Sequence, residues 1–185
     1  MVSAGDFRPG LTVEIDGAAF QVINFQHVKP GKGSPFVRTK MRNLVTGAVI
    51  EKTFRPDEKF PRAHIDRREM QYLYKSDDLF YFMDTENYEQ ISMTNEDLGD
   101  AVLWMRENAN IDVIFFQGRS IGVEVANFVE LTITQTDPGE RGNTVQGAFK
   151  PATLESGAVV QVPLFVNEGE VIKIDTRTGE YMTRV

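Results

Sequence analysis

Residues 20–42 read FQVINFQHVKPGKGSPFVRTKMR, and this stretch decides how the first part of the chain folds. Its two arms, 20–28 and 36–42, place apolar residues among polar ones with the two-residue period of a β-strand. The segment between the arms, KPGKGSP at 29–35, holds the glycines and prolines that are typical of a turn. The stretch therefore predicts a long β-hairpin.

The predicted tip of this hairpin carries one lysine, Lys32, between Gly31 and Gly33, with Pro30 and Pro35 outside them. Glycine permits unusual backbone angles and proline fixes φ near −65°, so the loop is expected to present the amine in a defined way. At roughly 3.3 Å per residue, an arm of six or seven residues would carry it on the order of 20 Å from the core. An ordinary solvated turn lysine is the commoner situation, because lysine is mostly exposed.

Positive charge is concentrated near this hairpin. Residues 1–64 contain ten Lys and Arg against six Asp and Glu, whereas residues 65–185 contain ten against twenty-one. Residues 17–50 have no acidic side chain, and their cationic residues are Lys29, Lys32, Arg38, Lys40 and Arg42. The last three are expected on one strand face, opposite Val37, Thr39 and Met41. Local positive charge on a chain of net charge −7 indicates binding to a polyanion, although a solvated strand face fits equally well.

Composition bounds the class of protein. The 185 residues include no cysteine, which excludes disulfides and thiolate metal sites and suits a reducing compartment, so we expect a cytoplasmic protein. The first ten residues lack the charged and apolar regions of a signal peptide, and no stretch approaches about 18 apolar residues. Secretion and membrane insertion are not expected.

Turn residues divide the chain into three small β-barrels, so the predicted fold class is all-β. Predicted strands of the first segment are 11–15, 18–28, 35–43 and 48–54, an SH3-like barrel of KOW type over residues 1–64. The second segment, 65–127, has predicted strands 69–75, 79–84, 88–93, 111–117 and 120–125 with a helix after the third, which is OB-fold order. The third, 128–185, has predicted strands 129–135, 145–149, 158–163, 171–175 and 180–184, a second OB-like barrel.

The predicted helix begins at a capping-box-like spacing of Thr94 and Asp97 and continues with apolar residues at helical spacing to about residue 108. Trp104 is expected to pack at the edge of this helix, since a lone tryptophan on an amphipathic helix is more often core than a base-stacking platform. The joint between the second and third barrels, residues 126–128, is too short for a free tether, so these barrels should keep a fixed orientation.

The sequence contains no combination of residues that predicts a catalytic or metal-binding site. His27 and His64 are the only histidines and lack partners at metal-ligand spacing. The Gly31-Lys32-Gly33 triplet is not a Walker A loop, because a glycine and a predicted strand follow the lysine where Ser or Thr and a helix are required. Neither an enzyme nor a cofactor is expected.

Three segments carry a resemblance to a known family. They are FQHVKPGKGSPFVRTKMRNLVTG at 25–47, EKTF at 51–54 and KPATLESGAVVQVPLFVNEG at 150–169. The last matches a long signature through Lys150, Ala152, Gly157, Val160, Val162, Pro163, Val166 and Gly169. Over its whole length the chain resembles bacterial elongation factor P.

The resemblance implies an elongated, L-shaped, monomeric protein of three barrels that binds the ribosome between the peptidyl and exit sites and relieves stalling at consecutive prolines. It implies that Lys32 approaches the acceptor end of the peptidyl-tRNA, and that a lysine-modifying enzyme extends this side chain in many members. The implied tip loop is Pro30, Gly31, Gly33, Ser34 and Pro35. The residues implied to meet ribosomal RNA are Lys29, Arg38, Lys40 and Arg42, and ribosomal proteins are further partners.

Two positions depart from the family pattern. Pro35 stands where many members have a small residue, and it stiffens the loop by narrowing its unfolded ensemble. A second implied contact, to messenger RNA near the exit site, falls on Gly139, Arg141, Gly142, Asn143 and Thr144, with Asn143 in place of the more familiar aspartate.

Two other functions stay open from the sequence. A general single-strand RNA-binding module of OB barrels would need basic grooves, whereas the second and third segments are acidic. A paralogue that acts on other stalling sequences would share the fold, the tip and the ribosome site.

Overall fold

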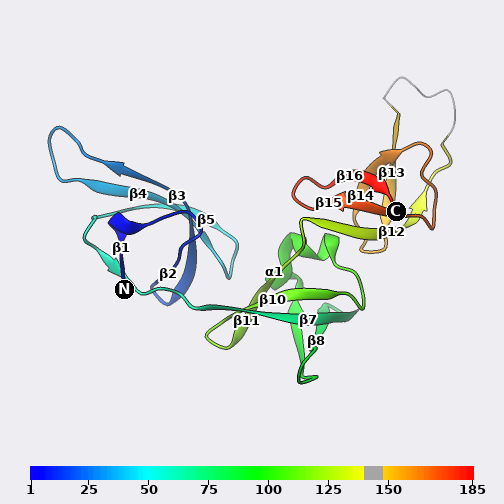
Figure 1. The fold of residues 1–185 in the computed structure, drawn as a ribbon, viewed down its shortest axis with the longest axis horizontal. Coiled ribbons are helices and arrows are strands. Elements are labelled where there is room, and N and C mark those ends of the chain that lie inside the picture. The colour runs from blue at the N-terminus through cyan, green and yellow to red at the C-terminus, as the bar shows by residue number, and fades with distance from the viewer. Residues whose placement is uncertain (140–147) are drawn as a thin grey trace. The chain divides into compact units, whose positions relative to one another are not determined.

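The computed structural model describes residues 1–139 and 148–185, and almost all of its regular structure is β-strand (Figure 1). Contacts between residues divide the chain into two compact units. The first comprises Met1–Arg68 with Val113–Gly122, and the second comprises Glu69–Asp112 with Val123–Val185. The prediction of an all-β chain is confirmed.

The first unit is built on a four-stranded antiparallel sheet in which strands adjacent in sequence are adjacent in space. Its strands are β2 (Thr12–Ile15), β3 (Ala18–Val28), β4 (Phe36–Asn43) and β5 (Val49–Phe54). A short pair, β1 (Val2–Ser3) with β6 (Lys59–Phe60), and the 3-10 turn Ala4–Asp6 accompany it. Each predicted strand of this segment is present to within one residue at either end.

The turn between β2 and β3 shows why these strands could be predicted from the sequence. Asp16 and Gly17 both have positive φ, 52° and 78°. Two-residue hairpin turns with positive φ at both central positions match the right-handed twist of the strands, and Asp-Gly is a favoured pair for them. This turn fixes the register that pairs Val13 with Phe20.

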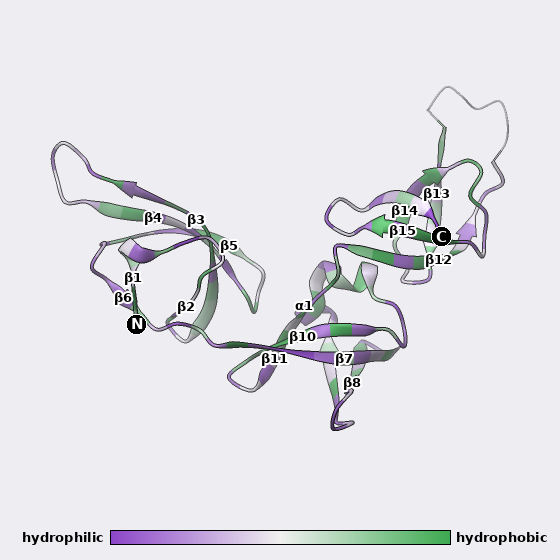
Figure 2. Ribbon diagram, in the orientation of Figure 1, coloured by the Kyte–Doolittle hydropathy of each residue, from purple (hydrophilic) through white to green (hydrophobic). Residues whose placement is uncertain are grey.

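The core of the first unit lies on one face of the sheet. Apolar and polar residues alternate along β4 (Figure 2), and the inward residues Val37, Thr39 and Met41 are completely buried. The rings of Phe7, Phe54 and Phe60 pack against this face with centroids 4.9–6.0 Å apart. Fully burying a side chain of this kind contributes roughly 1.5–3 kcal/mol, so these residues dominate the stability of the unit.

The middle sheet has the strand order β11-β10-β7-β8-β9. Its strands are β7 (Ile65–Ser76), β8 (Leu79–Asp84), β9 (Gln90–Thr94), β10 (Asn110–Phe116) and β11 (Arg119–Glu124). Strand β7 begins four residues earlier than predicted and β9 two residues later, whereas the order of five strands with a helical segment after the third agrees with the OB prediction.

The helix predicted to reach residue 108 is much shorter. The capping box is present: Thr94 Oγ1 accepts from the Asp97 amide at 3.2 Å, and the Asp97 carboxylate accepts from the Thr94 amide at 3.1 Å. Helix α1 nevertheless ends at Leu98, because Gly99 has φ 56°, outside the right-handed helical region. A 3-10 segment, η2 (Gly99–Trp104), follows, and Met105 is already extended.

The third sheet has the order β14-β13-β12-β15-β16. Its strands are β12 (Phe128–Thr136), β13 (Phe149–Leu154), β14 (Val159–Pro163), β15 (Val171–Asp175) and β16 (Glu180–Arg184). Of the strand predicted at 145–149, residues 145–147 lie outside the described residues, and only residue 149 belongs to a strand, since β13 starts at 149 and continues to 154. Pro151 made this strand hard to predict, because proline has no N–H to donate to a neighbouring strand and is therefore rarely expected inside a sheet.

Within the second unit, the position predicted for Trp104 is wrong. This residue is not at the edge of a long helix but packs against the core of the third sheet, which includes Leu131 and Ile174. Around it, Ser156 Oγ donates to the Leu103 carbonyl at 2.6 Å, and Thr176 Oγ1 donates to the Ala126 carbonyl at 2.7 Å. The two barrels of this unit are therefore in contact beyond their short joint.

Candidate functional site

The β3–β4 hairpin presents the predicted tip loop at its free end (Figure 1). Pairing between the strands continues to Val28 opposite Phe36, directly beside the loop of residues 29–35. One bulge interrupts the register between Val22 and Asn24 of β3. A hairpin paired up to its last residues is a stiff support for the loop, since a bulge adds twist without breaking the ladder at the tip.

Lys32 lies at the end of this loop and is exposed. Its side chain makes no hydrogen bond or ion pair with any residue that the structure describes. Neighbouring Gly33 has φ 109°, a conformation that side chains with a Cβ rarely adopt, whereas Gly31 has no such angle and open space around it. Of the two glycines, only Gly33 is required by the backbone.

The rest of the tip loop is accessible as well. Gly31, Ser34, Pro35 and the adjacent Lys29 are exposed, and Pro30 is half-buried. The Pro30 ring lies 3.7 Å from the place that a Cβ on Gly33 would occupy. The loop therefore folds over its own proline and leaves the ammonium group in solvent.

The outward face of β4 carries Arg38, Lys40 and Arg42, all exposed, in the alternation that the sequence predicts. Sequence reasoning missed a counter-charge: Glu51 on β5 is the cross-strand partner of Lys40, and the Arg38 Nε atom lies 3.6 Å from its carboxylate. The two side chains of this ion pair are 51% and 60% exposed. Such a pair contributes little stability, so a phosphate can displace Glu51 at small cost.

The first histidine lies on the other face of the hairpin, because His27 pairs with the buried Val37 and not with a cationic residue of β4. The exposed His27 ring meets Phe25 edge to face at 5.6 Å, and the Arg8 guanidinium lies 5.2 Å from the Phe25 centroid. His64 is exposed. Across residues 1–139 and 148–185, no group of three or more His, Cys, Asp or Glu side chains is arranged to hold a metal ion.

The predicted messenger-RNA contact is described only at its first residue. Gly139 lies against the backbone of Leu164, so that a Cβ added to it would overlap the Leu164 carbonyl oxygen. Arg141, Gly142, Asn143 and Thr144 lie outside the described residues.

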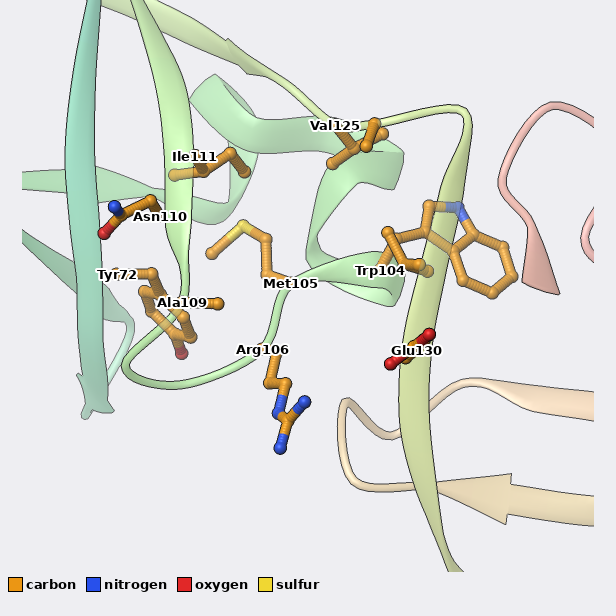
Figure 3. A pocket seen from close by; sticks show the side chains of 11 residues that line it. Tyr72, Trp104, Met105, Arg106, Ala109, Asn110, Ile111, Val125 and Glu130 are labelled. Atoms are coloured by element: carbon orange, nitrogen blue, oxygen red, sulfur yellow. The ribbon is translucent and has the colours of Figure 1, made fainter. Parts of the chain in front are cut away.

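A hollow in the second unit lies where its two barrels meet (Figure 3). Trp104, Met105 and Ile111 contribute apolar atoms, and Arg106 and Glu130 contribute charges at its rim. Tyr72 also lines it, and burial, with a further contribution from the negative charge of Glu107, raises the pKa of its phenol. That phenol therefore stays neutral at neutral pH.

No helix in the part of the chain that the structure describes is both long enough and apolar enough to cross a bilayer.

Comparison with known proteins covers nearly the whole chain. Residues 3–60 match the family model described as the elongation factor P (EF-P) KOW-like domain, residues 65–123 the elongation factor P OB domain, and residues 129–184 the elongation factor P C-terminal domain. The three matched domains follow the predicted order of an SH3-like barrel and two OB-type barrels.

Relatives and solved structures agree with these matches. Elongation factor P of Carboxydothermus hydrogenoformans is 61% identical, and that of Acetivibrio thermocellus 58% identical, each over 185 residues and 100% of both chains. The solved structure of eukaryotic translation initiation factor 5A from Methanococcus jannaschii shares the fold with a TM-score of 0.53 at 23% identity, covering 66% of this chain and 94% of that one. On the family matches and the full-length identities together, the chain belongs to the elongation factor P family.

Proposed function

We propose that this translation elongation factor binds the ribosome between the peptidyl and exit sites and promotes peptide-bond formation at consecutive prolines. Lys32 carries the proposal, because it is an exposed amine at the free end of a hairpin that is paired up to its tip loop, and it has no partner among the residues that the structure describes. In this proposal the hairpin places Lys32 beside the acceptor end of the peptidyl-tRNA.

The proposed mechanism is positioning, not bond-making. Proline's ring fixes φ, so a nascent chain that ends in prolines is stiff and can hold its ester in a poor geometry for attack. Holding reactants in a productive arrangement can lower a barrier by several kcal/mol, about 7–11 at the extreme. The ribosome supplies the chemistry, and a stiff loop with Pro30 and Pro35 supplies a fixed point of contact.

The basic face of β4 would orient the factor on RNA. Arg38, Lys40 and Arg42 project from one side of the strand, and Lys29 adds an exposed cation where β3 enters the tip loop. Phosphate neutralisation by such residues releases counterions and gives binding that weakens with salt. Ribosomal RNA is the proposed polyanion, with ribosomal proteins as further contacts.

Several finer assignments belong to the same proposal. Domain boundaries at 64/65 and 127/128 are supported by the gaps between the matched domains. The protein would act as a monomer in the cytoplasm. A lysine-modifying enzyme would act on Lys32, which its exposure permits.

A reconstituted translation assay tests the proposal. Wild-type protein should relieve a pause at a run of prolines, and Lys32→Ala should not, whereas Lys59→Ala, an exposed lysine on β6, should behave as wild type. Full activity of Lys32→Ala would contradict the assigned role. Ribosome profiling of a deletion strain separates the paralogue, because pauses at other sequences would then replace pauses at proline runs.

A further inference from the structure

Lys150 is the one lysine that is buried among residues 1–139 and 148–185, with 6% of its surface exposed. It lies on β13 in phase with the buried Ala152 and Leu154, directly across from the fully buried Val162 of β14. A lysine in a core row is unusual, and burying an ammonium costs free energy unless its donors are satisfied. The position calls for an account beyond packing.

The Lys150 Nζ atom donates to the backbone carbonyl of Asp137 at 2.6 Å. Asp137 directly follows the last residue of β12, and Lys150 is the second residue of β13. A hydrogen bond with one charged partner is shorter and roughly twice as strong as a neutral one. This bond therefore links the two ends of the β12–β13 connection.

A second contact holds the same two ends. The Leu164 amide donates to the Ala148 carbonyl at 3.2 Å, at the returning end of the connection. The Leu164 carbonyl lies so close to Gly139, at the departing end, that a Cβ there would overlap it. One residue of backbone after β14 thus contacts both ends, and this approach needs glycine at 139.

We infer that Lys150, together with Gly139, is a positioning element that sets where the β12–β13 connection leaves and re-enters the third barrel. This inference rests on the proposed function, extended by the messenger-RNA contact that the resemblance implies for the segment beginning at Gly139. Ends that are already ordered in the free protein reduce the entropy lost on binding, so anchoring them raises affinity without adding a contact. Lys150 itself touches no RNA in this scheme.

Amide hydrogen exchange tests the anchoring in the free, full-length protein. Lys150→Met keeps an unbranched side chain that is one atom shorter, and it removes the charge and the hydrogen-bond donor. The Leu164 amide should then exchange about tenfold faster, whereas the core amides of Leu131 and Ile172 should not change. Lys75→Met, an exposed lysine of the middle barrel, is the matched control and should leave all three amides unchanged.

Titration of the factor in the proline-pause assay tests the positioning role. Lys150→Met should raise the concentration needed for half-maximal relief several-fold and leave the maximal rate unchanged, because Lys32 is intact. Faster exchange with an unchanged half-maximal concentration would overturn the inference, and so would an unchanged exchange rate or a lower maximal rate alone.

Gly139→Ala provides an independent route should Lys150→Met fail to fold. Its Cβ would push the departing end off the Leu164 carbonyl while Lys150 remains, so it should reproduce both effects. Wild-type behaviour of Gly139→Ala would overturn the inference. A wild-type protein unable to relieve the pause would contradict the proposed function instead, and the exchange result would still decide whether Lys150 anchors Asp137.

Discussion

Arg38 and Glu51 face solvent side by side on neighbouring strands, with the Arg38 Nε atom 3.6 Å from the Glu51 carboxylate. Glu51 is therefore a local competitor for any phosphate that approaches the basic face of β4. Substitutions at this pair can therefore test RNA binding by the basic face separately from the role of Lys32 at the tip.

Charge changes at this pair should move ribosome affinity in opposite directions. Arg38→Glu should weaken binding and reduce the slope of log affinity against log salt by about 0.7–0.9, the amount for one phosphate contact. Glu51→Gln should tighten binding at low salt. Filter binding or light scattering across a salt series measures both, and an unchanged slope for Arg38→Glu would rule out a phosphate contact at this residue.

Gly33→Ala should impair the tip without unfolding the barrel. At φ 109° an alanine costs about 1–3 kcal/mol of strain, which the exposed loop relieves by moving Lys32. Pause relief should drop substantially, while the thermal midpoint should stay close to that of wild type. Gly31→Ala is the matched control, since its φ is ordinary and its surroundings are open, and it should lose much less activity. Equal losses for the two variants would contradict this account.

Thr39→Val should stabilise the first unit. The Thr39 hydroxyl is completely buried, and Oγ1 has no hydrogen-bond partner among the described residues. Valine has nearly the same shape without the unsatisfied group, so the free energy of unfolding should rise by about 1 kcal/mol. Denaturant unfolding measures this change. Thr53→Val, at an exposed position of β5, should change stability little, and a destabilised Thr39→Val would show that the hydroxyl has a partner in solution.

Asp175 should contribute to acid sensitivity. A two-pronged hydrogen bond from Arg177, at 3.1 and 2.9 Å, holds the pKa of the Asp175 carboxyl below its ordinary value of 3.8. A carboxyl with a lowered pKa stabilises the fold fully above its unfolded pKa and loses that contribution as pH falls through its folded pKa. Asp175→Asn should therefore flatten the loss of stability below about pH 3.8. Thermal unfolding at several pH values measures the loss, and parallel curves for the two proteins would contradict the prediction.

Intact mass of the protein isolated from its native cell should decide the state of Lys32. The unmodified chain has a mass of 20.9 kDa. Modification should appear as an excess that maps to the tryptic peptide spanning the tip and vanishes in Lys32→Ala. An excess that persists in Lys32→Ala would place the group elsewhere.

The β2–β3 and β3–β4 hairpins could be predicted from sequence because two independent observations agree there. Apolar and polar residues alternate along the strands, and residues typical of turns lie at 16–17 and 29–35. The helix after Thr94 was overestimated because apolar spacing outweighed Gly99, whose positive φ ends the helix after one turn. Strand β13 was misplaced because Pro151 interrupts the usual pattern, although Lys150, Ala152 and Leu154 keep their alternation through it.

Part of the candidate site could likewise be predicted from the sequence, and part could not. Exposure of Lys32 and the outward direction of Arg38 follow from local sequence, since turn chemistry and strand period set them. Glu51 beside Arg38 and Asp137 above Lys150 could not be found this way, because cross-strand register and the return of a distant loop place them. In Lys150 a signal was present, a cation in phase with core residues, but only the fold shows which carbonyl it reaches.

Trp104 is the single tryptophan of the chain, and it belongs to the middle barrel by sequence and to the third barrel's core by packing. Its indole lies 3.6 Å from the place that a Cβ on Gly179 would occupy. Tryptophan fluorescence therefore reports on this contact without a label: any event that separates the two barrels exposes the indole to water and shifts its emission to longer wavelength.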